Sequence, residues 1–285
     1  MIIRYASSGD LSEIQHLWAL GFPGEEEFSR IYFRDYFNLQ NTLIVQDRGK
    51  LCAMLQVFPY LLKIGRRVDR VSYIYGACTH PQYRGRGIMR FLFANVERLR
   101  RTAGDAATVL IPQERRLFDY YRRLGYKQGF FIKNSQWTIR PGNRSDVNLR
   151  QAEYKDVERM NALYEHNVRL TDGFIVRLRD DWLKQMALFR ATGGDVFYLD
   201  RHGECAAYGF VSEKKGLPWI QEGCAMDSKG LSDLANGIGS AYGREQVLLS
   251  TCVSYGESGE PIGCIKFLSS ERPICFSGYM NLMYN

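Results

Sequence analysis

Short apolar runs alternate with turn-forming residues along the first half of the chain, in an order that predicts a mixed α/β fold. The runs at 42–47, 51–64 and 71–79 read as three strands, with tight turns at Arg48-Gly49-Lys50 and Gly65-Arg66-Arg67. A strand–helix pair precedes them. A helix, a strand at 106–112, a helix at 115–124 and a final strand follow. This order predicts a central mixed sheet covered by helices.

The segment between the strand 71–79 and the next helix has the composition of an anion-binding turn. Its sequence is His80-Pro81-Gln82-Tyr83-Arg84-Gly85-Arg86-Gly87, and the helix then presents Ile88, Phe91, Leu92, Val96 and Leu99 as an apolar stripe. Backbone N–H groups at a helix N-terminus lack helical partners and carry partial positive charge. The segment therefore predicts an anion site, most often one for phosphate.

A second pattern repeats the start of the chain 146 residues later, the separation of Arg4 from Arg150. Each copy reads as a strand, a helix-capping aspartate (Asp10 or Asp156) and an amphipathic helix. We predict two tandem domains, at 1–140 and 148–285, joined by a polar linker at 141–147. The second copy is expected to be degenerate, because its counterpart of the glycine turn, Asp227-Ser228-Lys229-Gly230, lacks the Arg-Gly-Arg-Gly pattern.

Composition and charge limit the classes of ligand that the protein is expected to bind. The 285 residues carry a net charge of +7, which favours anionic ligands, but the charge is dispersed and argues against a nucleic-acid tail. Seven cysteines include no CxxC pair and four histidines do not join them, so we expect no metal site and no disulfide framework. No apolar run reaches signal-peptide or membrane-span length, which predicts a cytoplasmic protein without a membrane partner.

The motif from His80 to Met89, together with Tyr121, Gly125 and Tyr126, resembles those of the GNAT N-acetyltransferase family. The family's cofactor loop reads Arg/Gln-x-x-Gly-x-Gly/Ala, and this chain departs from it at Met89. The resemblance implies two acyl-CoA N-acyltransferase folds in tandem. The layout is similar to that of the enhanced-intracellular-survival acetyltransferases, whose C-terminal sterol-carrier-like domain we do not expect here.

The resemblance also implies residue roles. The backbone of Ala77, Cys78 and Thr79 would pair with the pantetheine arm of acetyl-CoA, while two further residues, Arg116 and Leu117, would flank the cofactor. The residues around the pyrophosphate would be Arg84, Gly85, Arg86, Gly87, Ile88, Met89 and Arg90. Cys78 itself reads as a small buried hydrophobe rather than a nucleophile.

Acetyl transfer also needs an acid and a base. The resemblance makes Tyr121 the general acid that protonates the departing sulfur, with Tyr120 as its rival and simple packing as the alternative. For the base, Asp69 and Glu26 are the nearby acids. In the resembling tandem enzymes the carboxylate at the end of the chain acts as the base, and here that carboxylate belongs to Asn285.

These features together predict an acetyl-CoA-dependent N-acetyltransferase that acts by direct transfer on a primary amine of an unidentified small molecule or peptide. Acetyl-CoA is the expected co-substrate, no metal is expected, and the second domain would shape the acceptor pocket. Two alternatives stay open: a non-catalytic acyl-CoA-binding regulatory module and a nucleic-acid-binding protein. Transfer of a longer acyl or aminoacyl group and assembly into a homo-oligomer also remain open.

Overall fold

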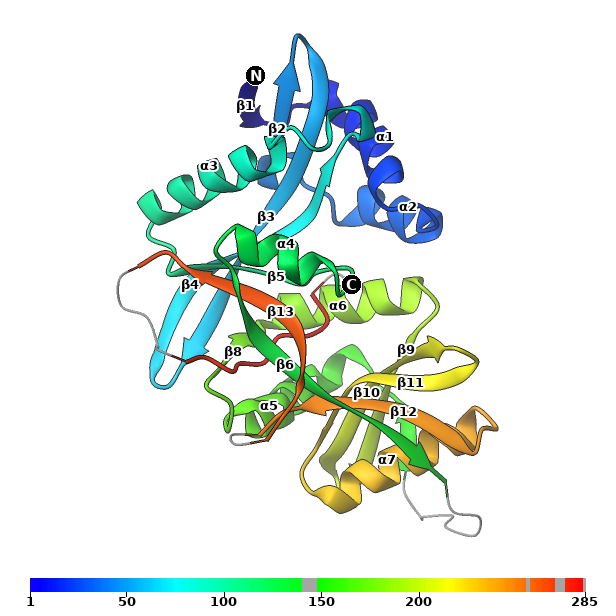
Figure 1. The fold of residues 1–285 in the computed structure, drawn as a ribbon. Helices are drawn as coiled ribbons and strands as arrows, with labels where there is room; N and C mark the ends of the chain where they lie inside the picture. The colour runs from blue at the N-terminus through cyan, green and yellow to red at the C-terminus, as the bar shows by residue number, and fades with distance from the viewer. Residues whose placement is uncertain (140–147, 255–256, 270–274, 284–285) are drawn as a thin grey trace. The chain divides into compact units, whose positions relative to one another are not determined.

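A computed structural model describes residues 1–139, 148–254, 257–269 and 275–283 (Figure 1). The predicted linker at 141–147 lies outside the described residues. Within the described part of the chain, no helix has the length and apolarity needed to cross a membrane. No group of three or more His, Cys, Asp or Glu gathers there as a metal site would.

Two compact units make up the fold, and each one takes in a piece of the other half of the sequence. The first unit consists of Met1–Gly129 and Gly263–Cys275, and the second of Phe130–Ile262 and Phe276–Asn285. The chain passes from the first unit to the second within one strand, β6 (Lys127–Thr138), and returns within another, β13 (Glu260–Phe267). Neither unit is therefore continuous in sequence.

In the described residues the first unit is a six-stranded mixed sheet with helices on both faces. The mixed sheet and its helices agree with the prediction, but its last strand is β13, whereas the strand predicted after residue 126 belongs mainly to the second unit. The strand order of the first unit is β1-β2-β3-β4-β5-β13, in which only β4 and β5 run parallel. In Figure 1, α3 covers one face of β2–β4, and α1 and α2 cover the other. The elements are β1 (Ile2–Tyr5), α1 (Leu11–Gly21), α2 (Glu26–Asp35), β2 (Thr42–Asp47), β3 (Lys50–Ile64), β4 (Arg67–Thr79), α3 (Ile88–Thr102), β5 (Ala107–Leu110), α4 (Leu117–Arg123) and β13 (Glu260–Phe267).

The second unit has the strand order β7-β9-β10-β11-β12-β6, again with one parallel pair, β11 and β12. This order matches that of the first unit position by position, and in both the last strand comes from the other half of the sequence. The elements are β6 (Lys127–Thr138), β7 (Asn148–Gln151), α5 (Val157–Val168), β8 (Gly173–Val176), α6 (Arg179–Ala191), β9 (Asp195–Arg201), β10 (Glu204–Lys214), β11 (Leu217–Ala225), α7 (Ser228–Ala241) and β12 (Gln246–Cys252).

The two aspartates predicted to cap helices hold a different contact. Asp10 accepts two hydrogen bonds of 2.7 Å from Arg4 and one of 2.7 Å from the Ser7 N–H, and it makes no side-chain cap bond to α1. Asp156 repeats this arrangement, accepting from Arg150 at 2.7 and 2.8 Å. Each aspartate does occupy the N-cap position of its helix, but the guanidinium holds its carboxylate in a bidentate contact and the expected side-chain cap bond is not made. The repeat itself recurs as the same local structure.

The apolar stripe of α3 is also shifted from its expected position. Leu92, Phe93 and Val96 are buried with Ile88 in one cluster, whereas Phe91 and Leu99 are 46% and 39% exposed. Phe91 lies on the opposite side of the helix from this cluster, and Leu99 belongs to the final turns. The stripe still directs the first turn of α3 toward the sheet, next to the glycine loop.

At the other end of the sequence, residues 279–283 are buried rather than frayed. The Tyr279 hydroxyl donates to Glu222 at 2.8 Å, and Arg177 donates to the Asn281 carbonyl at 3.0 Å. Glu222 and Arg177 are themselves a buried ion pair with bonds of 2.5 and 2.7 Å. These contacts fix the tail up to Met283; Asn285 lies outside the described residues.

Candidate active site

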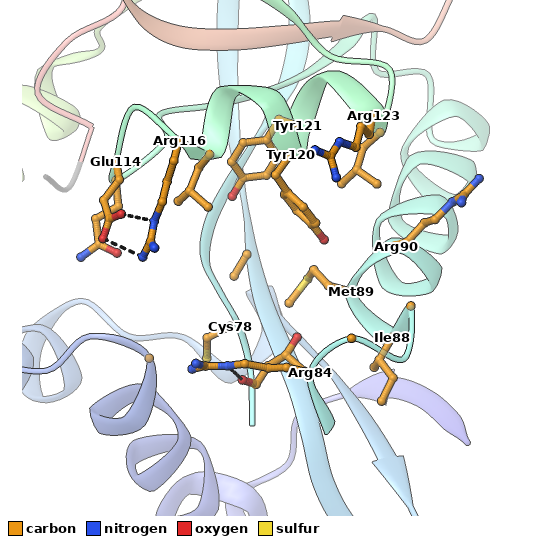
Figure 2. A pocket seen from close by; sticks show the side chains of 18 of the residues that line it. Cys78, Arg84, Ile88, Met89, Arg90, Glu114, Arg116, Tyr120, Tyr121 and Arg123 are labelled. Atoms are coloured by element: carbon orange, nitrogen blue, oxygen red, sulfur yellow. Dashed lines mark hydrogen bonds and ion pairs between the residues drawn. The ribbon is translucent and has the colours of Figure 1, made fainter. Parts of the chain in front are cut away.

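A cavity of about 590 Å³ opens in the first unit between the end of β4, the first turn of α3 and α4 (Figure 2). This volume is typical of small-molecule sites. The structure gathers around it all the predicted cofactor residues except Arg86, together with Tyr121. Its lining is Gly21, Phe22, Ala77, Cys78, Thr79, Tyr83, Arg84, Gly85, Gly87, Ile88, Met89, Arg90, Gln113, Glu114, Arg116, Leu117, Tyr120, Tyr121, Arg123 and Leu124.

The glycine loop leaves the start of α3 free to bind an anion. Gly85 and Gly87 have φ angles of 76° and 74°, which favour glycine, and a Cβ at either position would meet nothing within 4 Å. Gly87 is the N-cap residue and supplies no side-chain bond to the first N–H groups of the helix. These donors and the open space beside them suit a phosphate group.

Arginine side chains support the loop and charge the cavity. Arg84 donates from Nε to the Thr79 carbonyl at 3.1 Å and so ties the loop to the end of β4. Arg86 instead stacks its guanidinium 5.2 Å from the centre of the Tyr83 ring and is not part of the lining. Of the other lining charges, Arg116 pairs with Glu114, whereas Arg90 and Arg123 add positive charge. The cavity is therefore electropositive.

The last residues of β4 present unpaired backbone to the cavity. Pairing between β4 and β5 runs from Val71 to Tyr73 and, in the described residues, goes no further. A bulge follows at Gly76, whose φ is 57° and whose Cβ would collide with the Trp18 ring at 2.6 Å. The strand edge that β5 leaves unpaired at Ala77 can accept an extended ligand as an added strand, while the Thr79 carbonyl is held by Arg84.

Cys78 serves packing. Its side chain is buried, and the thiol lies 3.7 Å from the Leu17 carbonyl, to which it donates. Burial raises the pKa of the Cys78 thiol far above its ordinary value, so the thiolate needed of a nucleophile does not form at neutral pH. A Cβ on Gly21 would come within 2.8 Å of the Cys78 Cβ, which shows how closely α1 packs here.

Tyr121 and Tyr120 extend from α4 into the cavity, toward Met89 and the end of β4 (Figure 2). The Tyr121 ring packs against Phe93 and Tyr126, at centroid distances of 5.8 and 6.0 Å, and against Tyr120 at 5.3 Å. Burial, and to a smaller extent Tyr120 and Cys264, raise the pKa of the Tyr121 phenol well above its usual value. The phenol is held as a neutral proton donor.

Residues 2–129 match the family model described as an acetyltransferase (GNAT) domain. The first part of the chain is a GNAT acetyltransferase domain. The family implies acyl-CoA as the co-substrate of this GNAT domain, in agreement with the loop and cavity just described. No curated protein matches the chain.

Solved structures extend the likeness in fold beyond the GNAT domain. A GCN5-related N-acetyltransferase from Anabaena variabilis is 16% identical with a TM-score of 0.74, over 94% of this chain and 73% of that one. Eis1 from Mycobacterium abscessus is 14% identical with a TM-score of 0.66, over 95% and 75%. A putative acetyltransferase from Pyrococcus horikoshii is 12% identical with a TM-score of 0.60, over 99% and 94%. At these identities the likeness concerns the fold alone.

Sequence reasoning missed several walls of the cavity in the GNAT domain. Phe22, Gln113 and Glu114 lie on segments far from the glycine loop in sequence, and only the packing of α1 and β5 brings them together. Arg123 and Leu124 sit on the same face of α4 as Tyr120, so helical spacing from Tyr120 could have suggested them.

The acids considered for the base fall in different places. Asp69 lies within β4, pairs with Arg67 at 3.3 Å and does not line the cavity. Glu26 lines a second cavity of about 430 Å³ between α1 and α2, which shares Phe22 with the first. Its neighbour Glu25 accepts a hydrogen bond of 3.3 Å from Gln113, and burial raises the pKa of the Glu25 carboxyl.

Proposed function

We propose that the protein is an acetyl-CoA-dependent N-acetyltransferase that moves an acetyl group directly to a primary amine of a small molecule or peptide. One observation carries this proposal: the uncapped, glycine-lined start of α3 opens into the same cavity as the half-buried phenol of Tyr121. The first feature suits the diphosphate of coenzyme A, and the second suits a leaving sulfur.

In this reaction the cofactor lies along the free edge of β4, with its phosphates on the N–H groups of residues 84–90. The neutral amine attacks the thioester carbonyl carbon, a C–N bond forms and the C–S bond breaks. Backbone N–H groups near the β4 bulge stabilise the oxyanion of the tetrahedral intermediate. Tyr121 protonates the departing thiolate, and the amine proton passes to a base. The assignment of the base to the terminal carboxylate of Asn285 stays a prediction, and so does the assignment of the acid to Tyr121.

We further propose that the second unit is a degenerate copy of the GNAT fold that has no cofactor site. Two observations support this: the matching strand order, and the paired contacts of Arg4–Asp10 and Arg150–Asp156. At the start of α7 the Asp227 carboxylate accepts from the Gly230 N–H at 2.6 Å. This carboxylate takes up one N–H donor at the start of α7 and places a negative charge there. The corresponding position at the start of α3 is open and can receive a phosphate. A role in shaping the acceptor pocket stays a prediction.

Calorimetry with coenzyme A, followed by thiol release from acetyl-CoA across a panel of amines, tests the proposed function. We expect binding and amine-dependent release. Binding without release from any amine would favour a regulatory acyl-CoA module, and salt-sensitive binding of nucleic acid without coenzyme A affinity would favour the nucleic-acid alternative.

A paired comparison of Tyr121→Phe with Tyr120→Phe tests the acid. Loss of a general acid typically lowers turnover by on the order of 10²-fold or more, so Tyr121→Phe should lose kcat while keeping coenzyme A affinity. The neighbouring Tyr120→Phe is the matched control and should keep most of its turnover. The reverse pattern would make Tyr120 the acid.

A further inference from the structure

Lys266 of β13 makes a half-buried contact that joins the two helices of the cofactor cavity. Its Nζ donates to Glu97 Oε2 of α3 at 2.6 Å and to the Leu124 carbonyl at the end of α4 at 2.7 Å. The ammonium also lies 5.7 Å from the centre of the Tyr126 ring. All these residues belong to the first unit, although Lys266 lies more than a hundred positions further along the sequence.

The end of α4 is built to receive this side chain. Gly125 has a φ of 89°, and hydrogen bonds from Tyr126 N to Tyr121 O and from Gly125 N to Arg122 O complete a Schellman motif. The Leu124 carbonyl then accepts from Lys266, whose positive charge suits the negative end of the helix dipole. A Cβ on Gly125 would lie 3.2 Å from Lys266 Cε, so glycine also leaves the room for the lysine.

α4 depends on such contacts for its order. It has only seven residues, and isolated helices of this length are unstable in water. It nevertheless supplies Leu117, Tyr120, Tyr121 and Arg123 to the wall of the cavity. Cys264, two residues before Lys266 and on the same face of β13, belongs to the apolar cluster against which Tyr121 packs. β13 therefore contacts α4 in two ways: Cys264 belongs to the cluster that packs against Tyr121, and Lys266 binds the C-terminal end of the helix.

We propose that Lys266 is a positioning residue, which fixes α4 and thereby the Tyr121 phenol against α3. The proposal rests on the proposed function for its consequence in turnover. Fold stability alone is a poor explanation of the contact, because partly exposed ion pairs contribute little to stability and buried ones are often no more stable than an apolar pair of similar size. Glu97 also keeps its second oxygen, Oε1, buried without a partner.

Lys266→Met, which keeps the unbranched apolar part of the side chain and removes the ammonium group, is the first test. Hydrogen exchange of the apo protein should become about tenfold faster or more at residues 117–126, with little change at residues 88–96. Affinity for coenzyme A should stay within about threefold, because the loop amides are untouched. Turnover per coenzyme A-binding site should fall by about tenfold or more. Counting sites by calorimetry removes any loss caused by unfolded protein.

Two further variants separate positioning from charge and from general stability. Glu97→Gln/Lys266→Met leaves no stranded carboxylate, and we expect it to retain the fast exchange of α4 and the low turnover. The matched control is Lys133→Met, which removes an exposed lysine paired with Glu257 at 3.3 Å and should change neither quantity. Unchanged exchange of α4 in Lys266→Met, or full recovery in the double variant, would overturn the proposal. Wild-type protein that binds no coenzyme A would instead overturn the proposed function, and the exchange comparison would still decide the role of Lys266.

Discussion

At the scale of single residues, Tyr121 combines two properties that an exposed tyrosine lacks. Its ring is packed among Phe93, Tyr120 and Tyr126, and its hydroxyl belongs to a side chain that lines the cavity. Burial penalises the charged phenolate, so the pKa of Tyr121 is raised and the proton stays on the oxygen. A phenol of this kind remains neutral and keeps its proton in mildly alkaline solution.

This property predicts the alkaline side of the pH profile. Since the pKa of Tyr121 lies above the ordinary tyrosine value of about 10, kcat should not fall through ionisation of this residue between about pH 8 and pH 10. The measurement is kcat against pH for wild type and Tyr121→Phe at saturating acetyl-CoA. An alkaline loss of kcat below pH 10 that is present in wild type and absent from the variant would contradict the assigned environment.

Several properties of individual residues could be read from the sequence because they depend on near neighbours. The glycine loop lies between a strand and a helix that are both continuous with it, and Cys78 lies in an apolar strand that predicts burial. Phe22 and Gln113 could not be found in this way, because their place on the cavity wall depends on packing between distant segments. Arg86 carries a positive charge that suits an anion-binding loop, but its position in the sequence does not predict that the side chain stacks on Tyr83.

At the scale of elements, helix ends decide what each helix can bind. α3 begins at Gly87 without a side-chain cap and keeps its donors free, whereas α7 begins at Asp227, which occupies one of them. α3 and α4 both end before a glycine in the left-handed conformation, Gly104 at φ 85° and Gly125 at φ 89°. Only Gly125 also lies against a side chain from another element.

The two terminal glycines give a matched pair of substitutions. Gly104→Ala should destabilise the protein by about 1 kcal/mol, because alanine is unfavourable in the left-handed region. Gly125→Ala should destabilise the protein by a further amount of about 1–2 kcal/mol, because its methyl group also displaces Lys266. The free energy of unfolding from urea titration tests the difference, and equal losses at both positions would show that Lys266 accommodates the methyl group freely.

Most strands and helices could be predicted from periodicity and turn residues, while one helix, α2, and two strands, β8 and β13, were missed. α2 begins within the three consecutive glutamates at 25–27, which resemble a solvated acidic loop, although Phe28, Ile31 and Tyr32 lie at helical spacing and indicate the helix. β13 is short and apolar, without a clear periodicity. The aspartates at 10 and 156 followed the usual helix-start pattern, but arginines six residues earlier bind them.

At the scale of the whole molecule, the exchange of strands means that neither half of the sequence forms a complete unit. β5 pairs on one side with β4 and on the other with residues 264–267 of β13, from Leu110–Cys264 to Ala107–Phe267. Local patterns predict strands but not distant partners, so the sequence suggested a boundary near residue 140 and gave no sign of this pairing.

A fragment of residues 1–139 tests the consequence. It contains the glycine loop and all of α4, but it lacks β13 and Lys266, so we expect neither cooperative unfolding nor coenzyme A binding. A second fragment, in which residues 257–275 follow residue 139 through a flexible linker, should recover both. Calorimetry and circular dichroism make the comparison, and full coenzyme A affinity in the shorter fragment would show that the exchanged strand is dispensable.

The pairing of β5 with β13 also sets the order of events during synthesis. When the ribosome has finished α4, the buried apolar strand Ala107–Leu110 still has one open hydrogen-bonding edge, and its partner has not been translated. At roughly 5–20 residues per second, the nascent chain waits on the order of ten seconds or more for β13. An open strand edge is prone to intermolecular pairing, so newly made protein passes through a period in which it can aggregate before the mature fold closes.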